Sequence, residues 1–578
     1  MKKNYIFLLL LVLTVFFNNV AVSQTSLGTC SSFIKKIKKE LIVSTGRSEK
    51  KSFLLQIVDS KSFEGEINYK ESDATSELLI GEIKNISGSS FYLKAKEQSL
   101  EGHIILKKTK EAYKYSSDNK GNAYVSKVDI NSLICVDYTN ISQKEAKTAK
   151  KKSALISPDM LKLESFPGAS GCVLLDFDGY YMSPGNQWNS GNAIDAAPSG
   201  MSDADILNFF EVVSEDFKPF NLNITTNEAI FNGYSTKLRL RVVVTPTNTA
   251  APGTGGVAYL GSFGYDLPAW CFKLNNGKQG GEAASHEIGH TFGLLHDGRI
   301  SPSEQYFRGI NETAWAPIMG VGYYKSVVQW SKGEYDSANN TEDDVASISS
   351  LEYGVGYRVD DYGNDRASAF NLTFDNEGNI NEKKGIIEKE SDADFFAFTT
   401  TGGNVSIKTK TIARIDSGNL HLLIKLYDSS GAEIGKYWDE DPYKLNASMD
   451  VNLSAGKYFI EVRGTGAGDT KNGGYSAYGS IGSYSISGTV PNNNLNTLSF
   501  DKNLNFVIYP NPSNKIITIK SDHDAILNLI NALGKTIKTF EVKANVEDVL
   551  NVENLSSGIY FLSEMREGKL ITHKFVRK

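Results

Sequence analysis

The stretch GGEAASHEIGHTFGLLHD, residues 280–297, holds three of the seven histidines in this chain of 578 residues. On a helix, His286 and His290 are four residues apart, so both imidazoles project from one face and can bind one metal ion. Gly293 can adopt the left-handed conformation that ends a helix, after which the chain can turn and bring His296 back to the same point. The spacing therefore predicts three nitrogen ligands and one open position, which is the arrangement of a catalytic zinc ion.

Glu287 follows the first histidine and is expected beside the metal without being one of its ligands. Zinc lowers the pKa of a bound water from about 16 to about 7, and a neighbouring carboxylate can take the proton and pass it to a leaving amine. The pattern thus predicts one catalytic Zn²⁺, with His286, His290 and His296 as ligands and Glu287 as general base. A core helix with chance histidines is the alternative, and the third histidine at this spacing argues against it.

Length and composition are those of a globular protein with several domains. At about 150 residues per domain, the length predicts about four folded units. A hydrophobic content of 40% allows each unit to bury a core. The net charge of −6 is small, and no basic pattern with interleaved aromatics is present, which argues against a nucleic-acid partner.

The N-terminus predicts export from the cell. In MKKNYIFLLLLVLTVFFNNVAVSQ, two lysines precede a short apolar run and a small-x-small site, so residues 1–23 are interpreted as a signal peptide cleaved before Gln24. An uncleaved anchor is the alternative, but the run ends at polar Asn18 and Asn19, and no later apolar run is long enough to span a bilayer. We therefore expect a secreted or cell-surface protein without a stable membrane span.

Strand and helix patterns divide the middle of the chain. Residues 24–165 alternate like strands and include a lysine-rich stretch, 144–152, which is either a solvated linker or a processing site. In residues 166–356, a buried-type strand at Gly171–Gly179 precedes an amphipathic helix, Ser202–Phe217, with Ser202 as its N-cap, and further strands lead to the histidines. This order predicts an α/β fold, with a twisted sheet, a backing helix and an active-site helix.

The C-terminal part is expected to be all β. Short alternating strands separated by Gly, Asn and Asp turns in residues 357–490 predict a β-sandwich. An Asn-rich linker, 491–503, leads to a small all-β unit, 504–578. Together with the β-rich residues 24–165, these units are predicted to flank the α/β domain.

The pattern HExxHxxGxxHD, from His286 to Asp297, resembles the signature of the metzincin metallopeptidases, in particular their adamalysin- or reprolysin-like branch. In that family a methionine follows, and Met319 in WAPIMGVGYY is suitably placed to form an apolar surface beneath the ligands; plain core packing is the alternative. The resemblance implies that Gly293 and Asp297 are structural at the site. It also implies that residues 166–356 are a metzincin-like catalytic domain of a secreted zinc endopeptidase, which cleaves protein or peptide substrates.

The chain departs from this family at one position. Some metzincins place a tyrosine two residues after the methionine as a further zinc ligand, and this residue is Val321 here. Tyr323 and Tyr324 come later, and they either stabilise an oxyanion or pack in the core or at the rim. The family also implies that Val257–Phe263 is an edge strand that binds the substrate backbone, although an internal strand would look the same.

A cell-surface adhesin or binding protein with a non-catalytic metallopeptidase-like fold is the alternative function. Glu287 argues against it, because a binding protein does not need a base beside zinc.

By the same resemblance, residues 24–165 would be the propeptide of a zymogen. Cys135 would either ligate the metal as a thiolate switch or form a disulfide with Cys30, and Cys172 with Cys271 is a candidate second bridge. The four cysteines by themselves allow three connectivities, so the residues alone leave the pairing open.

Two further resemblances concern the flanking units. DDYGN, DADFFAFTTTGGNVSI and LSAGKYFIEVRG resemble the bacterial pre-peptidase C-terminal domain, some members of which bind calcium. Asp360, Asp361, Asp392 and Asp394 are the candidate Ca²⁺ ligands, with solvated turn residues as the alternative. IYPNPSN, LINALGKTI and LSSGIYFL resemble the C-terminal sorting domain of the type IX secretion system, which implies outer-membrane export with that machinery as partner; a small adhesive sandwich is the alternative.

Overall fold

The computed structural model describes residues 24–43, 51–134, 156–310, 314–411, 418–492, 507–566 and 569–578. The predicted signal peptide, the lysine-rich stretch at 144–152, Cys135 and nearly all of the linker predicted at 491–503 lie outside these residues. No helix in the described part is long and apolar enough to cross a membrane.

The N-terminal domain is one antiparallel sheet that packs against helix α1 (Cys30–Val43). The apolar residues Phe33, Ile34, Ile37 and Leu41 recur at helical spacing on α1 and face the sheet in a core of their own. The strand order is β1-β8-β7-β6-β5-β4-β3-β2. The strands are β1 (Gln24–Thr29), β2 (Ser52–Gln56), β3 (Ser62–Ser72), β4 (Ser76–Ile83), β5 (Ser89–Lys96), β6 (Ser99–Leu106), β7 (Glu111–Ser117) and β8 (Asn122–Asp129).

The next domain, called here the site domain, covers residues 156–358 and is built on a five-stranded sheet of order β12-β9-β13-β15-β14. The first four strands are parallel and β14 is antiparallel to β15. Every residue of β9 is buried, as expected for a parallel strand covered on both faces. The strands are β9 (Gly171–Asp176), β12 (Leu222–Thr225), β13 (Arg239–Val244), β14 (Gly256–Val257) and β15 (Ala269–Cys271), with two small pairs, β10 (Tyr180–Met182) with β11 (Ile194–Ala196) and β16 (Trp315–Pro317) with β17 (Val327–Gln329).

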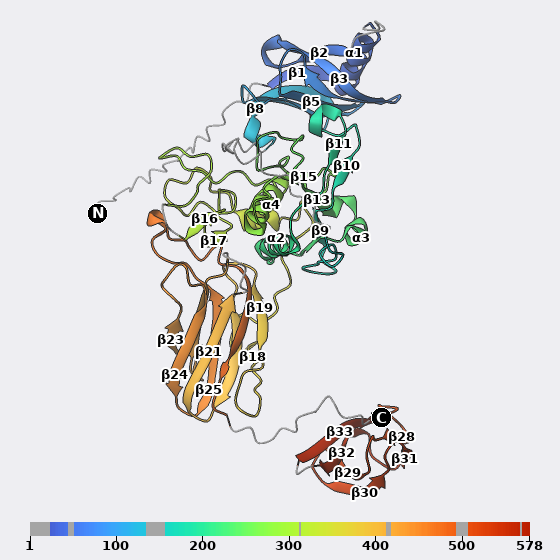
Figure 1. Ribbon diagram of the computed structural model, residues 1–578, viewed down its shortest axis with the longest axis vertical. Helices are drawn as coiled ribbons and strands as arrows, with labels where there is room; N and C mark the ends of the chain where they lie inside the picture. Colours follow the sequence, from blue (N-terminus) through green and yellow to red (C-terminus); the bar gives the residue numbers. More distant parts are fainter. Residues whose placement is uncertain are drawn as a thin grey trace, which may run out of the picture.

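Two long helices, α2 (Asp203–Asp216) and α4 (Gly277–Thr291), pack on the same face of this sheet (Figure 1). The Ser202 side chain accepts a hydrogen bond from the Asp205 amide, which confirms the predicted N-cap. The glycines at the start of α4 let the helices approach closely, since a Cβ on Gly280 would lie 2.6 Å from the Phe209 ring. This contact fixes α4 against the core.

The α/β fold class predicted for residues 166–356 is wrong. The structure is 42% strand and 13% helix with five helices among the described residues, so it is a β-rich protein of several sheets. The sequence interpretation extrapolated from one amphipathic helical stretch, the helix that carries the histidines and the order of the strands between them. The other two helices of the site domain, α3 (Glu228–Asn232) and α5 (Asp344–Ile348), have only five residues each, and short strands and turns fill the rest.

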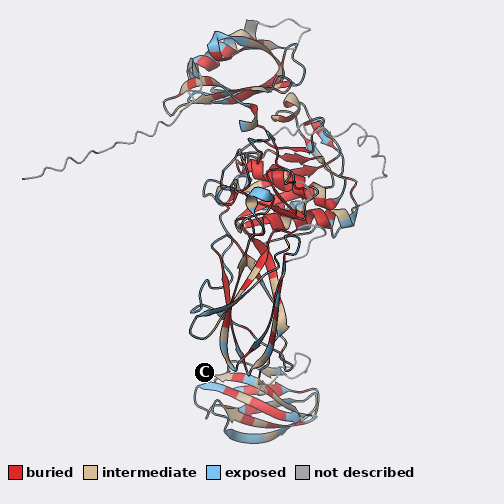
Figure 2. Ribbon diagram, turned by 90° about the vertical axis from the view of Figure 1, so that its left-hand side faces the viewer, coloured by how far each residue is buried: buried red, intermediate tan, exposed pale blue. Residues whose placement is uncertain are grey.

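The β-sandwich of residues 360–490 follows directly, and its core is continuous with that of the site domain. Figure 2 shows buried residues running from the site domain into the adjoining end of the sandwich. One sheet has the order β18-β20-β25-β22-β23 and the other β19-β26-β21-β24. The strands are β18 (Phe370–Asn371), β19 (Lys383–Ile387), β20 (Asp394–Thr400), β21 (Gly403–Thr411), β22 (Leu422–Tyr427), β23 (Glu433–Tyr437), β24 (Ala447–Leu453), β25 (Gly456–Gly464) and β26 (Gly482–Thr489).

The C-terminal unit has two small sheets around a separate core, with orders β27-β28-β31 and β30-β29-β32-β33. Its strands are β27 (Val507–Tyr509), β28 (Ile516–Lys520), β29 (Ala525–Asn531), β30 (Thr536–Val542), β31 (Glu547–Asn551), β32 (Gly558–Arg566) and β33 (Lys569–Arg577).

The disulfide predicted between Cys172 and Cys271 is wrong, because both are free and buried. Cys172 on β9 packs with Leu174 and Phe231 on one side of the sheet, whereas Cys271 on β15 belongs to the core on the other side. Strand β13 lies between them, so their side chains cannot meet with disulfide geometry. Cys30 is free and buried too, while its predicted partner Cys135 lies outside the described residues.

Candidate metal centre

Helix α4 and the turn after it bring the three predicted histidines together. His286 and His290 lie one turn apart on α4, which ends at Thr291. Gly293 has φ of +90° and its amide donates to the carbonyl of His290 at 2.9 Å, so this glycine reverses the chain in the left-handed conformation. The turn brings His296 back, and one ring nitrogen from each histidine lies within 4.8 Å of the others.

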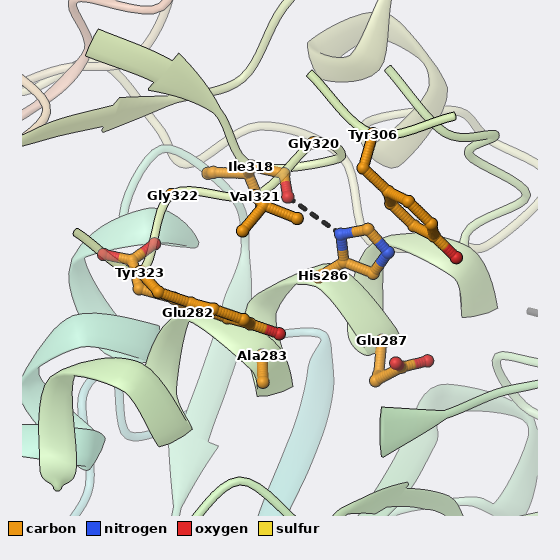
Figure 3. A pocket seen from close by; sticks show the side chains of 10 residues that line it. All are labelled: Glu282, Ala283, His286, Glu287, Tyr306, Ile318, Gly320, Val321, Gly322 and Tyr323. Carbon is orange, nitrogen blue, oxygen red and sulfur yellow. Dashed lines mark hydrogen bonds between the residues drawn. The ribbon is translucent and has the colours of Figure 1, made fainter. Parts of the chain in front are cut away.

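The hydrogen bonds of the two helical histidines determine which nitrogens face the centre. The Nδ1 of His286 lies 2.9 Å from the carbonyl of Ile318 (Figure 3), and the Nδ1 of His290 lies 2.6 Å from the carbonyl of Leu294. A carbonyl only accepts, so each Nδ1 carries the proton and each neutral ring has a lone pair on Nε2. The two Nε2 atoms face each other at 3.0 Å.

Two lone pairs this close repel unless a cation lies between them. Nitrogens bound to one tetrahedral zinc at about 2.0–2.1 Å are roughly 3.3 Å apart, which is near the observed separation. Burial, followed by the neighbouring histidines, lowers the pKa of both His290 and His296 well below its ordinary value. The imidazoles of His290 and His296 therefore stay neutral near pH 7, and the donor set fits Zn²⁺.

Glu287 lies against the edge of the sheet. A Cβ on Gly256 of β14 would meet the Glu287 carboxylate at 2.5 Å, so only glycine leaves room for this side chain. The chain after β14 runs beside α4, where the Gly261 amide donates to the His290 carbonyl and the Phe263 amide to the Thr291 carbonyl, both at 2.9 Å. The predicted edge segment Val257–Phe263 therefore passes beside the histidines, and β14 is the last strand of its sheet.

A pocket opens beside His286 and Glu287, lined further by Glu282, Tyr306 and the segment 318–323 (Figure 3). Of the two predicted tyrosines, Tyr323 lines this pocket, whereas Tyr324 is 80% exposed and does not. Tyr306 was missed by the sequence interpretation. Its ring centroid lies 4.3 Å from that of His296 and 6.1 Å from that of His286, and no spacing relative to the histidines signals it.

Met319 and Asp297 are both buried behind the histidines. The Met319 sulfur packs on Gly289 of α4, where a Cβ would come within 2.6 Å, and the Met319 carbonyl accepts from the Asp297 amide at 2.9 Å. Burial, then Glu342 and Glu334, raises the pKa of Asp297 to about 8. These contacts join the turn that carries His296 to the segment that carries Met319.

The four aspartates proposed for calcium meet at one end of the sandwich. Carboxylate oxygens of Asp360, Glu388 and Asp392 lie within 4.8 Å of one another, and so do those of Asp360, Asp361 and Asp394. Glu388, which comes four residues before Asp392, was not predicted. Nothing in its strand pattern distinguishes it from a solvated glutamate.

Three members of this acidic cluster are deeply buried, whereas Asp360 and Asp361 are exposed. Glu388, Asp392 and Asp394 are at most 3% exposed, and each has at least one carboxylate oxygen without a hydrogen-bond partner. Burial and the neighbouring carboxylates raise the pKa of Glu388 to about 10 and, against a hydrogen bond from Tyr484, that of Asp394 to about 9. Protons or a cation must compensate such a cluster, and carboxylate oxygens are the ligands that Ca²⁺ prefers.

Comparison with known proteins identifies the C-terminal unit. Residues 507–578 match the model of the secretion system C-terminal sorting domain, which confirms the resemblance to the type IX sorting domain. The protein is therefore secreted or displayed at the cell surface, and the type IX secretion machinery is a partner. No curated protein matches the chain.

Solved structures give only weak similarities. The pre-peptidase C-terminal domain of a collagenase from Bacillus anthracis is 14% identical and is matched over 97% of its length and 22% of this chain, with a TM-score of 0.15. The BSP domain of a biofilm associated protein (12% identity, 32% of this chain, 29% of that chain) has a TM-score of 0.12. β-Glucuronidase from Ruminococcus gnavus (12% identity, 38% of this chain, 37% of that chain) has a TM-score of 0.11. TM-scores this low do not establish a shared fold.

Proposed function

We propose that the protein is a secreted zinc-dependent endopeptidase that cleaves protein substrates. The proposal rests chiefly on the paired imidazoles: His286 and His290 direct unprotonated Nε2 atoms at one point, 3.0 Å apart, while backbone carbonyls hold both Nδ1 protons. Such outer hydrogen bonds orient metal-binding histidines. The HExxHxxGxxHD pattern, which resembles the metzincin signature, adds His296 as the third ligand.

Glu287 is the residue that would move protons in this site. Zn²⁺ held by the three histidines would supply a Lewis acid that activates water near neutral pH and polarises a carbonyl. The Glu287 carboxylate, one residue from a ligand and 3% exposed, accepts the proton of the attacking water and delivers it to the leaving amine. Tyr306, whose ring lies beside His296, is better placed than Tyr324 to donate a hydrogen bond to the developing oxyanion.

The edge of the sheet supports an extended peptide as substrate. The backbone of an edge strand can pair with an incoming strand, and the segment after β14 passes directly beside His290. The neighbouring pocket, between α4 and residues 318–323, has a volume of about 10 Å³, which is room for about one water beside His286 and Glu287. A peptide paired with the edge segment would lie across the histidines.

The N-terminal domain occupies part of this edge, which supports its role as a propeptide. Ile134 forms an antiparallel bridge with Tyr259, and the Leu260 amide donates to the Leu133 carbonyl at 3.2 Å. A substrate strand that pairs with the same segment would have to displace these residues. Removal of residues 24–134 would therefore free the edge, so we propose a zymogen activated by proteolysis.

Replacement of Glu287 tests the enzymatic proposal. In protein from which the N-terminal domain has been removed, we expect Glu287→Ala to keep about one zinc per chain by metal analysis while casein cleavage falls at least about 100-fold, the lower limit for loss of a general base. Glu352→Ala removes an exposed glutamate of the same domain and should leave both unchanged. Retained cleavage in Glu287→Ala would exclude the proposed mechanism.

The same assay distinguishes the alternative of an adhesin or binding protein. That protein would bind zinc and its partner but cleave neither casein nor gelatin after removal of the N-terminal domain, with or without a chelator. We also propose that the acidic cluster of the sandwich binds one Ca²⁺, because its buried carboxylate oxygens lack hydrogen-bond partners.

A further inference from the structure

The end of the N-terminal domain contacts the site domain as one strand of an antiparallel pair. Ile134 lies opposite Tyr259, and the Leu260 amide donates to the Leu133 carbonyl at 3.2 Å. Because this hydrogen bond joins the neighbours of Ile134 and Tyr259, these two residues form a non-hydrogen-bonded pair, in which opposite side chains lie closest together. The Ile134 side chain therefore lies beside the Tyr259 ring, and Ile134 is only 1% exposed.

An apolar surface of the site domain surrounds this contact. The Tyr259 ring packs on the Trp188 ring, with centroids 4.5 Å apart. The Trp188 Nε1 donates to the Pro268 carbonyl at 3.0 Å, so the polar group of the indole already has its partner. Met182 of β10 belongs to the same apolar cluster as Trp188, Tyr259 and Ile134. We call the surface formed by Met182, Trp188 and Tyr259 the apolar subsite.

The apolar subsite lies next to the proposed zinc site. Tyr259 falls between two residues that contact helix α4: Gly256, which lies against the Glu287 carboxylate, and Gly261, whose amide donates to the His290 carbonyl at 2.9 Å. A peptide that pairs with this segment in the same antiparallel sense as Ile134 would place one side chain in the subsite. Its neighbouring peptide bonds would then lie beside α4.

We propose that the apolar subsite selects a large aliphatic side chain of the substrate, and that Ile134 occupies it until the N-terminal domain is removed. This inference rests on the proposed endopeptidase function and narrows its substrates to extended peptides with isoleucine, leucine or valine opposite Tyr259. Burial of such a side chain against an apolar surface is favourable. A carboxylate would lose its hydration there without gaining a partner, because Met182, Trp188 and Tyr259 carry no charge.

Binding of a synthetic peptide tests the subsite without any cleavage. The protein carries Glu287→Ala and is freed of its N-terminal domain by a cut in the lysine-rich stretch, and the peptide has the sequence of residues 126–137 with Cys135→Ser. By fluorescence anisotropy, we expect Ile134→Ala in the peptide to weaken binding at least about tenfold, and Ile134→Asp at least about 100-fold. Ser132→Ala, at an exposed position, is the matched control and should bind like the unchanged peptide.

A peptide library measures the same selection during cleavage. The processed protein with Glu287 intact should prefer isoleucine, leucine or valine over aspartate at one substrate position by at least about 100-fold in kcat/KM. Tyr259→Ala should lower this ratio at that position alone. Tyr181→Ala, which changes an exposed residue of β10, should leave the ratio unchanged.

The two measurements separate this inference from the proposed function. If binding depends on Ile134 as expected but the processed protein cleaves no substrate, the subsite stands as a peptide-binding site and the endopeptidase proposal fails. If the processed protein cleaves casein while the Ile134→Asp peptide binds as tightly as the unchanged peptide, the subsite is overturned and the endopeptidase proposal stands. Absence of measurable binding by the unchanged peptide overturns the subsite as well. The decisive substitutions are made in the peptide, so they do not depend on the folding of a protein variant.

Discussion

The site domain contacts a neighbour on either side, and the two contacts differ in construction. Towards the sandwich, one apolar core runs through both domains, and buried polar groups cross the boundary. Asp216 of α2 accepts from Asn419 of the sandwich at 2.8 Å and from Ser285 of α4 at 2.6 Å. Since Ser285 precedes His286, this network joins the sandwich to the helix that carries the histidines.

Towards the N-terminal domain the contact is made by separate patches and not by one shared core. That domain has its own core, and it contacts the site domain through a separate cluster that includes Ile105, Ile134 and Tyr259. Among the described residues, the backbone–backbone contacts are the bridge of Ile134 with Tyr259 and the Leu260–Leu133 hydrogen bond. A second patch joins the sheet to residues 185–191, where the Asn68 side chain donates to the Ser190 carbonyl at 3.0 Å.

This difference indicates how each neighbour relates to the metal centre. Domains that share a core fold cooperatively, because neither can bury its apolar surface alone, whereas a domain with a separate core can leave without unfolding the rest. The sandwich is therefore an integral support of the proposed zinc site. The N-terminal domain has a core of its own, so its removal need not unfold the site domain, as the proposed zymogen requires.

The largest effect is expected from Asp216→Ala. It leaves the Ser285 hydroxyl and the Asn419 amide buried without their acceptor, which should lower the free energy of unfolding of the joined domains by about 2–5 kcal/mol. Denaturant unfolding measures this loss, and Glu211→Ala, exposed on the same helix, should cost less than about 0.5 kcal/mol. Equal stability of the two variants would contradict the importance of the network.

Calcium and pH should affect both joined domains in one transition. Glu388 and Asp394 have folded pKa values of about 10 and about 9, above their ordinary values near 4. The folded state thus binds more protons at these two groups than the unfolded state does. Without calcium, their contribution to stability is therefore largest below about pH 4 and is lost as the pH rises towards 9. We expect a loss of about 2 kcal/mol or more between pH 5 and pH 8 in chelator.

Added calcium should restore this stability at pH 8 and make it nearly independent of pH. Thermal unfolding followed at several pH values, with and without CaCl₂, checks the sign. A separate sandwich transition, with the site domain unaffected, would disprove the shared core.

Two adjacent isoleucines of β6 separate the stability of the N-terminal domain from its contact with the site domain. Ile104 faces the domain's own core, and Ile105 faces the site domain. Ile104→Ala should lower the unfolding free energy of the N-terminal domain by about 2–3 kcal/mol. Ile105→Ala should leave that domain folded. Once the lysine-rich stretch 144–152 is cut, the substitution should weaken the binding of the N-terminal domain to the site domain by about 2 kcal/mol. Size-exclusion chromatography after cleavage and thermal unfolding separate the two effects.

The smallest effect concerns His103, which stacks between Tyr92 and Tyr259 at this contact. Burial, helped by Lys114, lowers its pKa to about 4. Because the undocked imidazole has a pKa near 6.5, docking is strongest above that pH and weakens as the pH falls towards 4. Between pH 6.5 and pH 5.5 we expect a loss of about 1 kcal/mol in docking free energy.

His103→Phe should remove the pH dependence of docking. At pH 7.5 the variant N-terminal domain should dock as strongly as the wild type. To check this, the chain is cut in the lysine-rich stretch 144–152, and the fraction of N-terminal fragment released is measured from pH 7.5 to pH 5. A wild type whose docking does not change over this range would contradict the assignment.

Much of the candidate site could be predicted from local sequence patterns. The four-residue spacing of His286 and His290, the glycine at 293 and the Ser202 cap are short-range features, so the sequence predicts them directly. The aspartates at 360, 361, 392 and 394 also meet as expected, because turns at one end of a sandwich bring short acidic segments together. The predicted α/β fold class was wrong because two correctly predicted helices do not determine how much sheet surrounds them.

By itself, the sequence determined which helix carries the proposed zinc ligands and where it ends, since both depend on residues within one or two turns of each other. Only the tertiary structure decided which distant side chains join them. Tyr306 beside His296, Glu388 among the aspartates and Ile134 on the edge at Tyr259 all depend on packing between segments far apart in the chain. The opposite facing of Cys172 and Cys271 has the same cause, because a strand's side chains take their sides from the sheet it joins.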